Sequence, residues 1–169
     1  MADTEAHSQT TLRPATPADT PLIVCLIEEL AEYERLGDRC RADPATLGEH
    51  LFGKRPYAEV IIAEHGSEPA GFALFFHTFS TFACAPSVYL EDLFVRPRFR
   101  RRGIGGLLLR RVAALAVERG CRRLEWAVLN WNRPAIEFYL RLGAEAMDGW
   151  TIYRLDGGAL LAAGTDRQA

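Results

Sequence analysis

The chain has 169 residues, of which 49% are hydrophobic and 25% are charged, and its formal net charge at pH 7 is -2. This composition is typical of one globular domain, and the near-zero charge argues against general affinity for nucleic acid. Apolar stretches are interrupted by arginine, glutamate or glycine well before the roughly 20 residues that a membrane span needs, so we expect no membrane association.

These properties predict a single domain over residues 1–169, ordered from about 11 to 163, with frayed ends at residues 1–9 and 164–169. The first ten residues are polar and contain no apolar leader, which favours a cytoplasmic location. Four cysteines are scattered without a C-x-x-C pair or clustered histidines, at positions Cys25, Cys40, Cys84 and Cys121. We therefore expect neither a metal site nor a redox pair.

The first third of the chain predicts one strand and two helices. Residues 11–15 form a short strand-like run. Thr16-Pro17-Ala18-Asp19 then combines an N-cap residue, a proline at the first helical position and an acid at N3, which together start a helix. Apolar residues keep a 3.6-residue period to about Leu36, and Gly37 ends this helix. Asp43-Pro44 starts a second helix that ends near Gly53.

The middle of the chain predicts an antiparallel meander. Residues 57–64 and 70–80 are rich in strand-forming residues and are joined by a hairpin signal at residues 65–69. A third strand is expected over residues 87–95. An apolar helix follows over residues 104–117, and Gly120 caps its end.

The last third predicts two more strands and a helix. Residues 122–129 follow the apolar helix as a crossover strand, which is therefore parallel to the strand at 87–95. Asn132-Arg133-Pro134 opens a helix that ends at Gly143. Residues 150–155 are expected to form the last strand, and residues 157–163 a terminal turn of helix.

The segment that connects the strand at 87–95 to the apolar helix has the strand–glycine loop–helix arrangement of a phosphate-binding loop. Glycines let the backbone curl towards a ligand, and the start of a helix offers unpaired N–H groups to an anion. A dinucleotide fingerprint counted from Gly103 would require glycine where Leu108 stands, and a P-loop would require Gly-Lys-Ser/Thr, whereas Lys54 is the only lysine. A solvated arginine-rich turn is the structural alternative for this loop.

The remaining pattern, Arg100-x-x-Gly103-x-Gly105, resembles the acetyl-CoA signature of the GNAT N-acetyltransferases, and the predicted order of elements matches theirs. Several stretches resemble the diamine acetyltransferases, of the spermidine/spermine or thialysine type, and lie at residues 29–34, 89–95, 127–132 and 138–139. This resemblance implies an α/β fold with a mostly antiparallel sheet of six or seven strands. One central parallel pair would splay apart at the coenzyme site, and helices would cover both faces.

The resemblance also implies which residues bind acetyl-CoA. Backbone groups at the splayed strand would bind the pantetheine arm, the glycine loop would surround the pyrophosphate, and the start of a later helix would touch the coenzyme. These residues are Leu93, Phe94, Val95, Arg100, Arg101, Arg102, Gly103, Ile104, Gly105, Gly106, Asn132, Arg133, Pro134 and Ala135. Arg101 departs from the family, which commonly has glycine there. We expect the loop to keep an allowed backbone conformation at Arg101, with the added cation facing a phosphate.

Acetyl transfer to an amine needs a base and an acid. Glu91 is the candidate base, directly or through water, and Tyr139 resembles the family's tyrosine acid near the coenzyme sulfur. The structural alternatives are that Glu91 and Asp92 point to opposite faces of the strand, one making a salt bridge, and that Tyr139 is a core residue. Asp92 is assigned a structural role.

The amine pocket is expected at Tyr33 and Glu34, with Glu91 and Asp148 as further carboxylates. The alternative is that Glu32 and Glu34 form a solvated helix end. The segment between Ala144 and Trp150 is shorter than in the subfamily, so the sequence does not define the wall of the amine pocket that this segment would form.

The sequence thus predicts direct acetyl transfer from acetyl-CoA to a primary amine of a small polyamine or lysine-like amine. The rival functions are a protein or peptide N-acetyltransferase and a non-catalytic acetyl-CoA-binding regulatory module. By resemblance, we also expect a homodimer.

Overall fold

The computed structural model describes residues 9–165. The ends expected to fray, residues 1–8 and 166–169, lie outside this range. Contacts divide the chain into two compact units, Met1–Leu129 and Asn130–Ala169.

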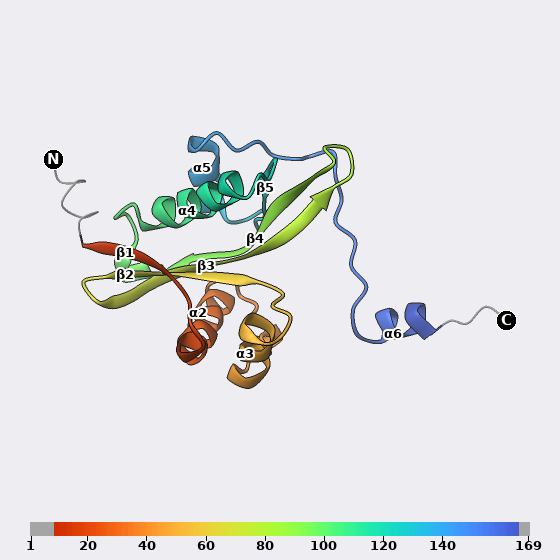
Figure 1. The fold of residues 1–169 in the computed structure, drawn as a ribbon, viewed down its shortest axis with the longest axis horizontal. Coiled ribbons are helices and arrows are strands. Elements are labelled where there is room, and N and C mark those ends of the chain that lie inside the picture. The colour runs from red at the N-terminus through yellow and green to blue at the C-terminus, as the bar shows by residue number, and fades with distance from the viewer. Residues whose placement is uncertain (1–8, 166–169) are drawn as a thin grey trace. The chain divides into compact units, whose positions relative to one another are not determined.

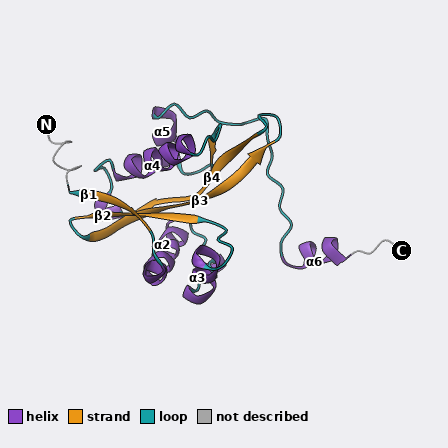
Figure 2. Ribbon diagram, in the orientation of Figure 1, coloured by secondary structure: helices purple, strands orange, loops and turns teal. Residues whose placement is uncertain are grey.

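The first unit is built on a sheet of five strands in the order β1-β2-β3-β4-β5. Three neighbouring pairs are antiparallel, and two of them form the predicted meander of β2, β3 and β4. The pairing of β4 with β5 is parallel, as predicted. The bounds are β1 Thr10–Pro14, β2 Glu59–His65, β3 Glu68–Ser80, β4 Ala85–Val95 and β5 Leu124–Glu125. The parallel pair therefore lies at the edge of the described sheet, not at its centre, and the sheet has fewer strands than expected (Figure 2).

Two helices, α2 Thr20–Tyr33 and α3 Pro44–Phe52, cover one face of the sheet (Figure 1). Asp19 completes the capping box begun by Thr16, accepting a hydrogen bond from the Thr16 amide. Asp43 caps α3 by accepting a hydrogen bond from the Thr46 amide, as the sequence predicted. The buried core on this side joins helix residues to alternate strand residues, namely Ile23, Leu26, Leu30, Leu51, Val60, Ile62, Phe72, Leu74 and Phe94. The face of Phe72, Leu74 and Phe94 is called the α2 face below.

Helix α4, Ile104–Glu118, covers the opposite face, and its buried residues include Leu108 and Val112. Gly120 ends it with a φ of +69°, donating its amide to Val117 while Cys121 donates to Ala116. These two bonds form a Schellman motif, which confirms the predicted cap.

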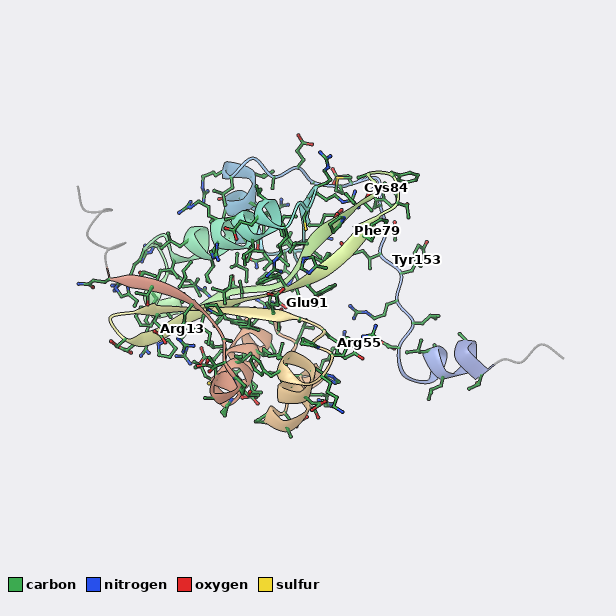
Figure 3. The ribbon with its side chains drawn as sticks, viewed as in Figure 1. Arg13, Arg55, Phe79, Cys84, Glu91 and Tyr153 are labelled. Carbon is green, nitrogen blue, oxygen red and sulfur yellow. The ribbon has the colours of Figure 1, made fainter. Side chains whose placement is uncertain are left out.

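The second unit contains α5 Arg133–Arg141 and α6 Gly157–Thr165, both close to their predicted positions. The strand predicted at residues 150–155 was wrong, because the chain has no regular structure there. The sequence alternates as a strand should, but the apolar side chains are exposed, Ile152 to 76% and Tyr153 to 90%. Tyr153 is labelled on this extended stretch in Figure 3. A strand forms only where a neighbour pairs its backbone groups. The strand predicted at residues 122–129 is likewise reduced to the two residues of β5.

Candidate active site

The glycine loop leads from β4 through a short 3-10 turn, Pro97–Phe99, into α4. Gly103 is the N-cap of α4 and has a φ of +77°, a left-handed conformation that favours glycine. The first bond of the helix runs from the Leu107 amide to the Gly103 carbonyl. The amides of Ile104, Gly105 and Gly106 consequently have no acceptor within the helix, which is the geometry expected of the predicted anion-binding end.

Strand β4 has a free edge beside this loop. Pairing with β5 covers only Val88 and Tyr89, so β4 from Leu90 to Val95 has no strand beside it on that side within the described part of the first unit. The parallel pairing is therefore confined to two residues of β4, and the predicted splay of the pair stays a prediction. Gly71 of β3 lets the other side of β4 approach closely, since a Cβ there would overlap the Phe94 carbonyl oxygen. The side chain of Phe94 belongs to the buried core, so only its backbone is available to a ligand.

Two arginines of the loop differ from expectation. Arg101 has a φ of +61°, so the prediction of an ordinary backbone conformation there was wrong. The loop requires a left-handed backbone conformation at the residue before Arg102. Arg101 adopts this conformation at a steric cost of about 1–2 kcal/mol. Arg100 donates from Nε to the Val95 carbonyl at 2.9 Å, and its guanidinium lies 4.4 Å from the centre of the Tyr33 ring. Arg100 thus connects the loop to the end of α2.

A bulge in β4 brings two carboxylates to one face. Asp92 lies opposite Leu74, but Leu90 lies opposite Phe75, so Glu91 is an extra residue in the ladder. Because a bulge sets two residues against one, Glu91 and Asp92 both lie on the α2 face with Leu74. The alternative that they point to opposite faces was wrong. Figure 3 shows Glu91 over the central part of the sheet, away from the hairpin tip where Phe79 and Cys84 are labelled.

Asp92 has the most unusual protonation in this group. Burial raises the pKa of its carboxyl, the nearby negative charges of Glu91 and Glu34 raise it in the same direction, and together they bring it to about 7. Glu34, at the C-cap of α2, also has a raised pKa because of burial. The alternative of a fully solvated helix end therefore does not hold for Glu34. Glu34, Glu91 and Asp92 are called the acidic cluster below.

Sequence reasoning assigned Asp92 a structural role, and the structure places it with the predicted site residues. A bulge cannot be read from an alternating sequence, so the shared face was not visible there. The one available signal was the adjacent pair of acids itself, within a strand that is otherwise apolar.

The remaining predicted residues belong to the second unit. Asn132 is buried and caps α5, with its side-chain oxygen 3.4 Å from the Ala135 amide. Arg133 and Pro134 are exposed at the start of α5. Tyr139 is half-buried on α5, and its ring centre lies 5.2 Å from that of Phe138. Asp148 is exposed in the irregular segment after α5.

The fold and this loop define an acyl-CoA-dependent transferase, and comparison with known proteins gives the family. Residues 25–144 match the acetyltransferase (GNAT) family, to which the chain belongs. It is therefore an enzyme of that family.

Curated relatives extend the match over nearly the whole chain. A thialysine N-epsilon-acetyltransferase of Bos taurus is 36% identical over 160 residues, covering 88% of this chain and 94% of the relative. A protein of the same name from Caenorhabditis elegans is 36% identical over 86% of this chain and 91% of its own. An L-ornithine N5-acetyltransferase of Arabidopsis thaliana is 33% identical, with coverages of 89% and 86%.

Solved structures show the same fold. An integron cassette protein of Vibrio cholerae has a TM-score of 0.79 and 26% identity, covering 93% of this chain and 98% of its own. An aminoglycoside acetyltransferase from a soil metagenome, with sisomicin, has a TM-score of 0.75 and 18% identity over 89% of this chain and 99% of its own. No helix among residues 9–165 is long and apolar enough to cross a membrane.

Proposed function

We propose that this enzyme transfers the acetyl group of acetyl-CoA directly to the terminal amine of a small lysine-like amino acid, such as thialysine or ornithine. The names of the curated relatives support this substrate class. The observation that carries the proposal is the acidic cluster beside the glycine loop. Arg100 of the loop stacks on Tyr33, and the next residue, Glu34, interacts electrostatically with Asp92.

The acidic cluster fits the proton chemistry of the reaction. An alkylamine has a pKa near 10.4, so its neutral form costs about 4–5 kcal/mol at pH 7. A base works best when its pKa lies near the working pH. Asp92, with a pKa of about 7, meets that condition and joins Glu91 as a candidate base. Glu34, across the cluster, is proposed to hold a second ammonium group of the substrate, and Tyr33 to line the same pocket. Asp148, in the second unit, is proposed as a further carboxylate for the amine on the resemblance alone.

The cosubstrate supplies an activated acetyl thioester, and this chain binds it through three features. We assign the pyrophosphate to the amides of Ile104, Gly105 and Gly106 and the arginines beside them. The free edge of β4 at Leu93, Phe94 and Val95 fits the amides of the pantetheine arm as an added strand. The start of α5, residues 132–135, is assigned to the same ligand.

Tyr139 is proposed as the acid that protonates the leaving thiolate. A phenol, with a reference pKa near 10, can donate to a thiolate whose conjugate acid lies near 8.5 only with some help from its surroundings. The competing role, a packing residue beside Phe138, predicts loss of stability and no specific loss of rate when the hydroxyl is removed.

A single domain and a homodimer are also part of this proposal. Exposed apolar side chains in the second unit, at Trp150, Ile152, Tyr153 and Leu155, support burial against a second copy. The described cysteines are all unpaired, which supports the reducing environment of the cytoplasm.

The test is the rate of CoA release from purified protein with thialysine, ornithine, lysine, putrescine, spermidine and a lysine peptide. We expect the highest kcat/KM with a lysine-like amino acid, and loss of at least about 100-fold in kcat for Tyr139→Phe. A preference for the peptide would favour the protein acetyltransferase. Binding of CoA without amine-dependent release from any acceptor would establish the non-catalytic module.

A further inference from the structure

His65 lies at the end of β2 and is almost completely buried, with 7% of its surface exposed. Its ring makes two polar contacts. Nδ1 lies 2.8 Å from the Thr10 hydroxyl on β1, and Nε2 lies 3.1 Å from Nη1 of Arg102 in the glycine loop. A buried histidine thus connects the edge of the sheet to the loop.

The chemistry of these partners fixes the protonation of the ring. Arginine has only N–H donors, so Nε2 of His65 must accept the bond. The proton of the neutral ring then resides on Nδ1 and is donated to the Thr10 hydroxyl. A doubly protonated ring would have a donor at each nitrogen and would lose the bond to Arg102.

The aromatic ring of Phe99 lies near both His65 and Arg102. Its ring lies 5.8 Å from that of His65 in an edge-on arrangement, and the Arg102 guanidinium lies 5.9 Å from its centre. The other charged groups nearby are an ion pair: Arg98 lies 4.8 Å from the Phe99 ring and is bonded at 2.8 Å to Glu68, the strand partner of His65. Arg102 itself has no carboxylate partner among the ion pairs of residues 9–165.

We propose that His65 is a positioning residue for the coenzyme: as a neutral acceptor, it holds the Arg102 guanidinium at the loop so that this cation faces a phosphate of the bound ligand. The bond to His65 uses one of the five N–H donors of Arg102. An imidazole orients the arginine without neutralising it, whereas a carboxylate would compete with phosphate for its charge. This proposal rests on the proposed function, because it assigns acetyl-CoA to the glycine loop.

The test measures CoA binding to the full chain by calorimetry, with kinetics as a second readout. His65→Phe keeps a ring against Phe99 and removes both polar atoms, and we expect it to weaken CoA binding about tenfold. His65→Gln keeps an acceptor towards Arg102 and should restore most of the affinity. The KM for acetyl-CoA should rise in His65→Phe while the KM for the amine and kcat stay within about twofold, since the acceptor pocket is intact.

A matched control is His50→Phe, because His50 also packs edge-on against an aromatic ring, that of Tyr57 at 5.4 Å, on the other side of the sheet. It should leave CoA binding unchanged. A double-mutant cycle with Arg102→Ala tests the mechanism. His65→Phe should cause little further loss of CoA affinity in the Arg102→Ala background, and fully additive losses of affinity would overturn the proposal.

The outcomes separate this proposal from the function on which it rests. If the wild type does not bind CoA, the coenzyme assignment fails and this inference fails with it. If the wild type binds CoA and His65→Phe binds equally well, only the role of His65 is rejected. If His65→Phe does not fold, Thr10→Val replaces it, since it removes the hydroxyl that accepts the Nδ1 proton and holds the ring in place, and wild-type affinity in Thr10→Val would reject the role.

Discussion

At the residue scale, Arg101 combines backbone strain with a proposed contact to phosphate. Two arginines of the chain, Arg35 and Arg101, share a φ of +61°, but only Arg101 lies in the glycine loop. This pair makes it possible to separate the cost of the conformation from the value of the charge.

We expect Arg101→Gly to raise the free energy of unfolding by about 0.5–1 kcal/mol, because relief of the left-handed strain exceeds the added entropy of the unfolded chain. It should also weaken CoA binding, since a cation is lost. Arg35→Gly is the control and should gain similar stability with unchanged CoA affinity. Urea unfolding and calorimetry measure the two effects, and equal CoA affinities for both variants would show that Arg101 does not face a phosphate.

Asp92 makes stability depend on pH in an unusual direction. Its pKa is about 7 in the folded protein and 3.8 as a reference, so the folded state binds the proton more tightly than the unfolded state does. The resulting stability is fully present below about pH 4, is lost progressively as the pH rises through 7, and is essentially gone by about pH 8. Most carboxylates with a depressed pKa behave in the opposite way.

We therefore expect the unfolding free energy of the wild type, relative to that of Asp92→Asn, to fall by about 2 kcal/mol between pH 5 and pH 8. Urea melts of both proteins at the two pH values measure this difference. Glu91→Gln should reduce it, because the Glu91 charge is one cause of the raised pKa. A difference that does not change with pH would mean that Asp92 is ionised throughout this range.

At the element scale, α4 has a left-handed glycine at each end, Gly103 before its first turn and Gly120 after its last. Only the first end is assigned to the coenzyme. Gly103→Ala and Gly120→Ala should each reduce the free energy of unfolding by about 1 kcal/mol. Of the two variants, only Gly103→Ala should weaken CoA binding, by about tenfold or more, because the loop amides move. Equal CoA affinities for the two variants would remove the loop from the binding site.

Elements with local signals could be predicted from the sequence, and elements that depend on partners could not. The capped helices α2, α3 and α4 and the meander of β2, β3 and β4 are specified by caps, turns and periodicity within each segment. The turn between β2 and β3, with positive φ at Gly66 and Ser67, agrees with the predicted hairpin. The strands at residues 122–129 and 150–155 required a neighbour, which no local signal reports.

The site shows the same division. The glycine loop could be predicted from its motif, because glycines and a helix start act through the backbone. Glu91 was predicted from its place on the strand and from the family resemblance. The role of Asp92 depended on a bulge, and the contact between His65 and Arg102 joins residues 37 positions apart. Neither follows from spacing along the chain.

At the scale of the whole molecule, the proposed homodimer makes a direct prediction. The second unit exposes Trp150, Ile152 and Tyr153, and burial of such side chains contributes about 25 cal/mol per Å². Sedimentation should give about twice the 18.8 kDa mass of one chain. Trp150→Asp should shift the protein towards monomer, whereas Phe82→Asp, at a still more exposed aromatic residue of the β3–β4 turn, should not. A wild-type mass of one chain would contradict the dimer.

Because Glu91 is an extra residue in β4, its carboxylate can be removed without changing how the strands of the sheet pair. If Glu91 were deleted outright, Leu90 would still oppose Phe75 and Asp92 would still oppose Leu74, so the ladder would become regular and its neighbours would keep their faces. Loss of a residue elsewhere in β4 would instead reverse the faces of the residues beside it. The length of β4, as well as its composition, therefore sets how many carboxylates lie at the proposed site. Deletion of Glu91 would remove one carboxylate and leave the pairing of the sheet intact.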